Sequence, residues 1–114
     1  MTFVRRVVRS SRYERDAARL LRPSVQQELE ESIAAEPERH PLIPGTGGFR
    51  KARWARRGKG KSGGFRVVYF FLGEQGRIYM AAIYAKSRKK TLSAVDQNVL
   101  ARLATQIKKA ARGG

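Results

Sequence analysis

The chain has 114 residues, which is enough for one domain (1–114) with a single modest core. Its 25 Lys and Arg residues outnumber its 9 Asp and Glu residues, giving a net charge of +16. This charge predicts a polyanionic partner, and nucleic acid is favoured over an anionic membrane surface. The lack of cysteine and the single His argue against a disulfide framework, a metal site or a cofactor. No apolar run approaches the ~18 residues of a membrane span, so we expect a cytoplasmic protein without a membrane partner.

The first third of the chain predicts a strand followed by a helical hairpin. Residues 3–8 mix valines with arginines and are typical of a short strand that pairs within the main sheet. Residues 11–21 have apolar side chains at helical spacing, and Pro23 ends that helix. Ser24 and Gln27 form a capping-box signal for a second helix. Its apolar stripe is Val25, Leu29 and Ile33. We expect the two helices to pack on the sheet.

The charges are segregated along the chain. Seven of the nine acidic residues lie between residues 14 and 38, so the helical hairpin is the only near-neutral part. A polyanion is therefore expected to approach the strands and loops that follow rather than the helices.

Residues 45–72 form the stretch around which the rest is organised. They are expected to form a strand, a basic glycine-rich hairpin loop and a second strand, with Trp54 packed under or beside the basic surface. Glycines allow the backbone to approach a bulky ligand. The cations of both strands are expected to face one phosphate-binding surface. These cations, together with those of the loop, are Arg50, Lys51, Arg53, Arg56, Arg57, Lys59, Lys61 and Arg66.

Two apolar strands and a final helix complete the expected fold. Residues 65–72 and 77–85, joined by a turn at 73–76, read as the centre of the sheet, because continuous apolar runs indicate burial on both faces. A last helix begins at Ser93, with Asp96 as its capping partner. Its predicted buried face is Val95, Val99, Leu103 and Ile107. The expected class is α+β, with a small, mostly antiparallel sheet packed by helices.

The residue types limit the possible chemistry. The segment 58–62 (GKGKS) lacks the earlier glycine and the β-loop-α context of a nucleotide-binding loop. No acid lies between Glu38 and Glu74, which excludes paired-carboxylate and two-metal chemistry from this stretch. RNA cleavage needs only a positioned 2′-hydroxyl, a base, an acid and cations for the phosphate, and lysines crowded by other cations can act as bases. The candidates are Lys51, Arg53, Arg66 and Lys86, which can meet on one face. A purely electrostatic binding face is the alternative.

The segments "GTGGFRKAR", "GFRVVY" and "IYAK" resemble the RelE/ParE superfamily of bacterial toxins, most closely its HigB-like branch. The resemblance covers nearly the whole chain. It implies a RelE-like fold, with an N-terminal strand plus a three-strand antiparallel unit, a two-helix hairpin and a C-terminal helix. It also implies the toxin of a type II toxin–antitoxin system, an endoribonuclease (mRNA interferase) that cleaves mRNA in the ribosomal A site without a metal. The implied partners are mRNA and rRNA on the ribosome and a cognate, HigA-like DNA-binding antitoxin.

By position, the resemblance assigns catalysis to Lys51, Arg53, Arg66 and Lys86. The tyrosine near the C-terminus of the founding member has no counterpart near Leu92, and Tyr84 is the candidate for base stacking in its place. The expected RNA- and ribosome-binding residues are Arg50, Arg56, Arg57, Lys59, Lys61, Arg88, Lys89 and Lys90.

Two other functions remain open from the sequence. One is a non-catalytic RNA- or ribosome-binding protein, which has no need for four converging cations. The other is a gyrase-directed, ParE-like toxin or an inactivated copy, and that branch does not depend on the basic strand residues.

Overall fold

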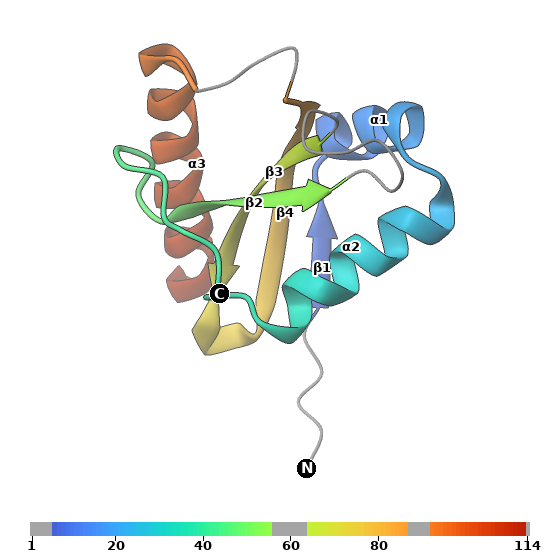
Figure 1. Ribbon diagram of the computed structural model, residues 1–114. Coiled ribbons are helices and arrows are strands. Elements are labelled where there is room, and N and C mark those ends of the chain that lie inside the picture. Colours follow the sequence, from blue (N-terminus) through green and yellow to red (C-terminus); the bar gives the residue numbers. More distant parts are fainter. Residues whose placement is uncertain (1–5, 56–63, 87–91, 114) are drawn as a thin grey trace.

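The computed structural model describes residues 6–55, 64–86 and 92–113. In chain order the elements are β1 (Arg6–Arg9), α1 (Ser11–Leu20), α2 (Pro23–Ala35), β2 (Phe49–Ala55), β3 (Gly64–Leu72), a 3-10 turn (Gly73–Gln75), β4 (Arg77–Ala85) and α3 (Ala94–Gly113). The strand order is β1-β4-β3-β2, with β1 parallel to β4 and the other pairs antiparallel. The α1–α2 hairpin lies on one side of this mixed sheet and α3 on the other (Figure 1). The expected α+β class is confirmed.

Side chains of β3 alternate between the two faces of the sheet, which creates two cores. Phe65, Val67 and Tyr69 pack with the hairpin side chains Tyr13, Ala17, Leu29 and Ile33. Val68 and Phe70 pack on the other face with Phe49, Ala104 and Ile107. The strand is therefore buried on both faces, as its continuous apolar run predicts.

The helix starts follow local chemistry, with one correction. Ser10 caps α1, because its hydroxyl accepts a hydrogen bond from the backbone N–H of Tyr13 at 3.0 Å. The predicted capping box of α2 is wrong: α2 begins at Pro23, whose fixed φ suits the first helical position, and Arg22 precedes it without a side-chain cap. The capping box of α3 is confirmed, since Ser93 and Asp96 exchange side-chain-to-backbone bonds of 3.1 and 3.2 Å.

The predicted buried face of α3 is correct only in its C-terminal half. Val95 and Val99 are 70% and 57% exposed, whereas Leu103 and Ile107 pack toward the sheet as predicted, together with Leu100 and Ala104. A strict four-residue spacing drifts around an α-helix that has 3.6 residues per turn, so the predicted stripe cannot stay on one face over more than three turns.

The loop before β2 holds α3 against the sheet. Gly47 has φ +75°, and a Cβ atom there would lie 3.1 Å from the Cβ of Ala104, so glycine permits this close approach. The Lys108 ammonium donates to the Gly47 carbonyl at 2.9 Å. Buried Thr46 stabilises the same loop, because its hydroxyl donates to the Ile43 carbonyl at 2.7 Å.

A buried polar network fixes the hairpin to β1. Glu30 is only 6% exposed, and its carboxylate accepts hydrogen bonds from Arg9, Gln26 and the Tyr13 hydroxyl. Burial alone would raise the pKa of Glu30, but these donors outweigh burial and lower the pKa overall. Glu30 is thus committed to structure and differs from the exposed acids of the hairpin.

Candidate phosphate-binding and catalytic site

Strand register brings the central cations onto the α3 side of the sheet. Arg53 of β2 lies directly opposite Arg66 of β3, and Arg66 lies directly opposite Tyr84 of β4. Residues two apart on a strand share a face, which places Lys51 beside Arg53 and Lys86 beyond Tyr84. The backbone N–H of Lys86 still donates to the carbonyl of Gly64 at 3.0 Å, so the alternation continues past the end of β4.

These five residues differ in depth. Arg53 is exposed, Lys51, Tyr84 and Lys86 are half-buried, and Arg66 is only 8% exposed. Arg66 is therefore the most buried of the four cations and Arg53 the most exposed. This surface, which we call the basic face, suits a phosphate group, whose oxygens accept bidentate hydrogen bonds from arginine.

Arg66 is buried without a compensating carboxylate. Within residues 6–55, 64–86 and 92–113, no carboxylate forms an ion pair with it, and its Nη1 donates only to the neighbouring Phe65 carbonyl at 3.3 Å. Burying an unpaired charge is costly, and Arg53 directly opposite adds like-charge repulsion. An anion bound beside Arg66 would relieve both costs.

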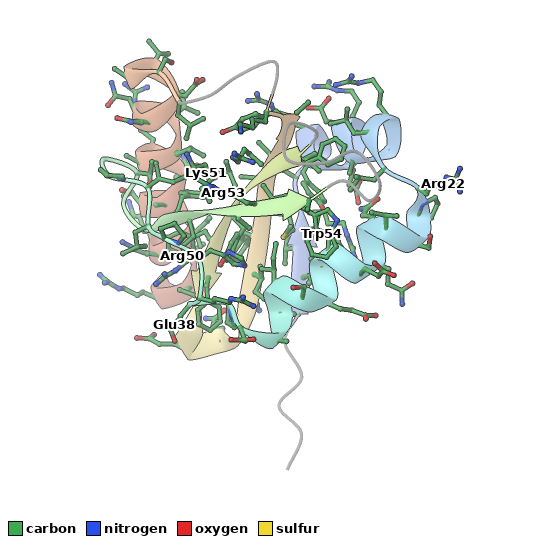
Figure 2. All side chains as sticks on the ribbon, viewed as in Figure 1. Arg22, Glu38, Arg50, Lys51, Arg53 and Trp54 are labelled. Atoms are coloured by element: carbon green, nitrogen blue, oxygen red, sulfur yellow. The ribbon has the colours of Figure 1, made fainter. Side chains whose placement is uncertain are left out.

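Arg50 lies on the other face of the sheet, so the prediction that it shares a surface with Lys51 is wrong. Figure 2 shows Arg50 and Trp54 on one side of β2 and Lys51 and Arg53 on the other. The Nη1 of Arg50 donates to the carbonyls of Glu38 and His40 at 3.1 and 2.7 Å. Because adjacent strand residues point to opposite faces, Arg50 fastens the loop after α2 rather than joining the basic face.

Trp54 likewise lies away from the basic face. It packs against the core between the sheet and the helical hairpin, and it lines a groove of about 700 Å³ between that hairpin and the end of β2. Of the two predicted positions, beside the basic surface is wrong and under it is confirmed, because Trp54 lies on the opposite face of β2 from Lys51 and Arg53 and points toward the hairpin.

Seven of the predicted RNA-binding cations lie outside the described residues. They are Arg56, Arg57, Lys59, Lys61, Arg88, Lys89 and Lys90.

Tyr84 and Asp96 lie close to each other at this site, a proximity that the sequence did not predict. The Tyr84 hydroxyl oxygen is buried and has no hydrogen-bond partner among the described residues. Burial raises the pKa of Tyr84, Arg66 opposes this, and Asp96 reinforces it. The sequence identified Asp96 only as a capping residue, and nothing local indicated that the start of α3 lies near Tyr84.

The described part of the chain contains no helix long and apolar enough to cross a membrane. Within the same residues, no three His, Asp or Glu side chains come together as a group that could hold a metal ion.

A family model described as "RelE toxin of RelE / RelB toxin-antitoxin system" matches residues 11–113. The chain belongs to the RelE toxin family. Two solved structures share its fold at 16% sequence identity. One, a mutant of the E. coli toxin RelE in the free state, has a TM-score of 0.56 and covers 85% of this chain and 96% of its own. The other, from the intact E. coli RelBE toxin–antitoxin complex, has a TM-score of 0.52 and covers 70% and 94%.

In this RelE-family toxin the basic face can perform only a limited set of steps. Lysine and arginine side chains donate hydrogen bonds and neutralise negative charge, and a neutral lysine amine can accept a proton. They suit a reaction in which charge accumulates on phosphate oxygens.

Proposed function

We propose that this RelE-family toxin of a type II toxin–antitoxin system is a ribosome-dependent, metal-independent endoribonuclease of the HigB-like branch. It cleaves mRNA in the A site and so inhibits translation in the cytoplasm. The observation that carries the proposal is the convergence of Lys51, Arg53, Arg66 and Lys86 on one face, with Arg66 buried and without a carboxylate partner among the described residues. A binding surface has no use for a buried unpaired cation, whereas a site that stabilises a developing phosphate charge does.

The proposed chemistry uses the mRNA's own 2′-hydroxyl. A lysine amine, from Lys51 or Lys86, takes the proton of that hydroxyl, and the 2′-oxygen attacks the adjacent phosphorus. The bond from phosphorus to the 5′-oxygen breaks, and that oxygen takes up a proton from the ammonium group of the other lysine. Arg53 and Arg66 hold the phosphate oxygens while their negative charge increases. The products are a 2′,3′-cyclic phosphate and a 5′-hydroxyl.

The ribosome has a defined part in this proposal. The more exposed cations of the basic face bind RNA of any sequence, because phosphate contacts carry no sequence information. The ribosome holds mRNA extended in the A site, where it can present the 2′-hydroxyl in line with the leaving oxygen. The proposed contacts to mRNA and rRNA also include the seven predicted RNA-binding cations outside the described residues.

We propose a cognate antitoxin as the second partner, a HigA-like DNA-binding protein. The family description names a toxin–antitoxin system, and the fold is shared with a chain of the RelBE complex. With a net charge of +16, the toxin would otherwise bind RNA throughout the cell.

Expression of the toxin without its antitoxin, followed by mapping of mRNA ends, tests the proposal. We expect growth and protein synthesis to stop and new mRNA ends to appear within translated codons, while Arg66→Gln gives neither. Purified toxin should cleave mRNA far faster on ribosomes than free. DNA breaks with continued translation would instead indicate a gyrase-directed toxin. Ribosome binding without cleavage would indicate a non-catalytic binding protein.

A further inference from the structure

The hydroxyl of Tyr84 differs from the two fully buried tyrosine hydroxyls of the helical hairpin side. The Tyr13 hydroxyl donates to Glu30 at 2.9 Å, and the Tyr69 hydroxyl donates to the Pro37 carbonyl at 2.6 Å. The Tyr84 hydroxyl oxygen is also buried, yet no described residue is its partner. A phenylalanine would fill the same space without burying an unsatisfied polar atom. The hydroxyl is therefore a group for which the fold itself has no use.

Its position ties this hydroxyl to Arg66. The two residues lie directly opposite on β4 and β3, on the face that also carries Arg53, and cross-strand neighbours of this kind are in side-chain contact range. The Tyr84 ring is partly buried against the core on the α3 side of the sheet, and the hydroxyl oxygen at its tip is covered. The role proposed below is one for the hydroxyl. This differs from the base-stacking role that the sequence suggested.

The chemistry of the hydroxyl fits the same phosphate. Burial raises the pKa of Tyr84, so the phenol stays protonated at neutral pH and can donate. Arg66 on the neighbouring strand supplies positive charge, which draws an anion toward this part of the face.

We propose that the Tyr84 hydroxyl donates a hydrogen bond to a non-bridging oxygen of the scissile phosphate held by Arg66. This inference rests on the proposed ribonuclease function and adds to it a neutral donor. No proton leaves the tyrosine during the reaction. The phosphate gains a second donor beside Arg66, and the buried hydroxyl gains a hydrogen-bond partner. Because the oxygen is covered in the free protein, binding must also move the groups that cover it.

The test compares Tyr84→Phe with Tyr79→Phe. Tyr79 lies on the same strand and the same face, toward the opposite end, and makes a matched control for loss of a hydroxyl. Cleavage would be followed on ribosomes programmed with mRNA, with saturating ribosomes so that the rate reports chemistry. Ribosome affinity and the urea midpoint of unfolding would be measured in parallel.

We expect Tyr84→Phe to slow cleavage about 10- to 100-fold, with ribosome affinity and the urea midpoint unchanged or the midpoint raised. Tyr79→Phe should cleave at the wild-type rate. Wild-type cleavage by Tyr84→Phe, together with loss of cleavage in Arg66→Gln, would overturn the role of Tyr84 and leave the ribonuclease intact. A lowered urea midpoint in Tyr84→Phe would also overturn it, because the hydroxyl would then serve the fold. No cleavage by the wild-type toxin would remove the proposed function itself.

Discussion

Arg53 and Arg66 lie directly opposite each other on β2 and β3, although like charges at such positions repel. Arg66 is the buried member of the pair, and its guanidinium has no carboxylate partner among the described residues. The protein therefore retains two cations where stability alone would favour one or none. Their common position is the basis of the first prediction.

Arg66→Gln should lower the rate of cleavage on ribosomes by about 100-fold or more, the usual loss when a preorganised donor to a transition state is removed. Its free energy of unfolding should stay the same or rise by about 1 kcal/mol, because a buried unpaired charge is removed. Arg77→Gln is the control, since Arg77 lies on the same face at the other end of β4. Single-turnover kinetics and urea titrations measure both effects. A stable Arg66→Gln variant with wild-type cleavage would contradict the prediction.

Lys59→Ala and Lys61→Ala should weaken ribosome binding with little change in the rate of cleavage at saturation. Each loss should reduce the slope of log affinity against log salt concentration by about one, because one fewer counterion is released. Binding measured between low and physiological salt, for each variant and for Arg66→Gln, gives the comparison. If Arg66→Gln and the lysine variants changed only binding, and by similar amounts, no catalytic site would exist on this face.

Glu30→Gln should destabilise the protein by roughly 1–3 kcal/mol at pH 7, because Arg9 and the Tyr13 hydroxyl lose their charged acceptor. The folded pKa of Glu30 is lowered, so its contribution to stability is present above the unfolded pKa of about 4.3 and disappears as the pH falls through the folded value. Urea midpoints between pH 7 and pH 3 should therefore converge for wild type and variant at the acid end.

Glu31→Gln is the control for Glu30→Gln, because Glu31 is exposed and, within the described part of the chain, its carboxylate accepts a side-chain hydrogen bond only from Gln27. It should change stability by no more than about 0.5 kcal/mol. A midpoint for Glu30→Gln equal to that of Glu31→Gln across the whole pH range would show that the network around Glu30 does not stabilise the hairpin.

The cognate antitoxin should protect the basic face from hydrogen exchange. Opposite charge would attract an acidic antitoxin segment to residues 51–55 and 64–66, where the cations are concentrated. Exchange measured by mass spectrometry, with and without antitoxin, would show this protection. Association should also slow as salt is added. Protection confined to residues 11–35 would instead indicate that the antitoxin blocks ribosome entry from the helical hairpin.

Strand positions were predictable because turn chemistry and apolar runs are local. The last strand has the predicted bounds, Arg77–Ala85, since the preceding turn ends at Gly76 with φ +62°, which suits glycine. Side chains along a strand alternate between its two faces, so Lys51 and Arg53 share one face and Arg50 points to the other. The prediction that all three cations share one surface did not take this alternation into account.

Other features depend on residues far apart in the chain. The pairing of Arg9 with Glu30 across 21 positions has no local signal, so Glu30 could not be told from the exposed acids around it. The burial of the Tyr84 hydroxyl and its proximity to Asp96 depend on how α3 packs against the sheet. The apolar spacing of α3 did not predict that packing fully, because Val95 and Val99 fit the spacing and yet face solvent.

The parallel pairing of β1 with β4 affects how the protein is made. The Ser10 hydroxyl donates to the carbonyl of Ala81, 71 positions later, whereas β2, β3 and β4 pair with neighbours in the sequence. Contacts between distant residues form slowly, because a long loop must close before they stabilise anything. A chain emerging during synthesis therefore holds β1 without its partner until β4 has been made. The hairpins that carry the basic face can form first, and docking of β1 is the step expected to limit the rate of folding.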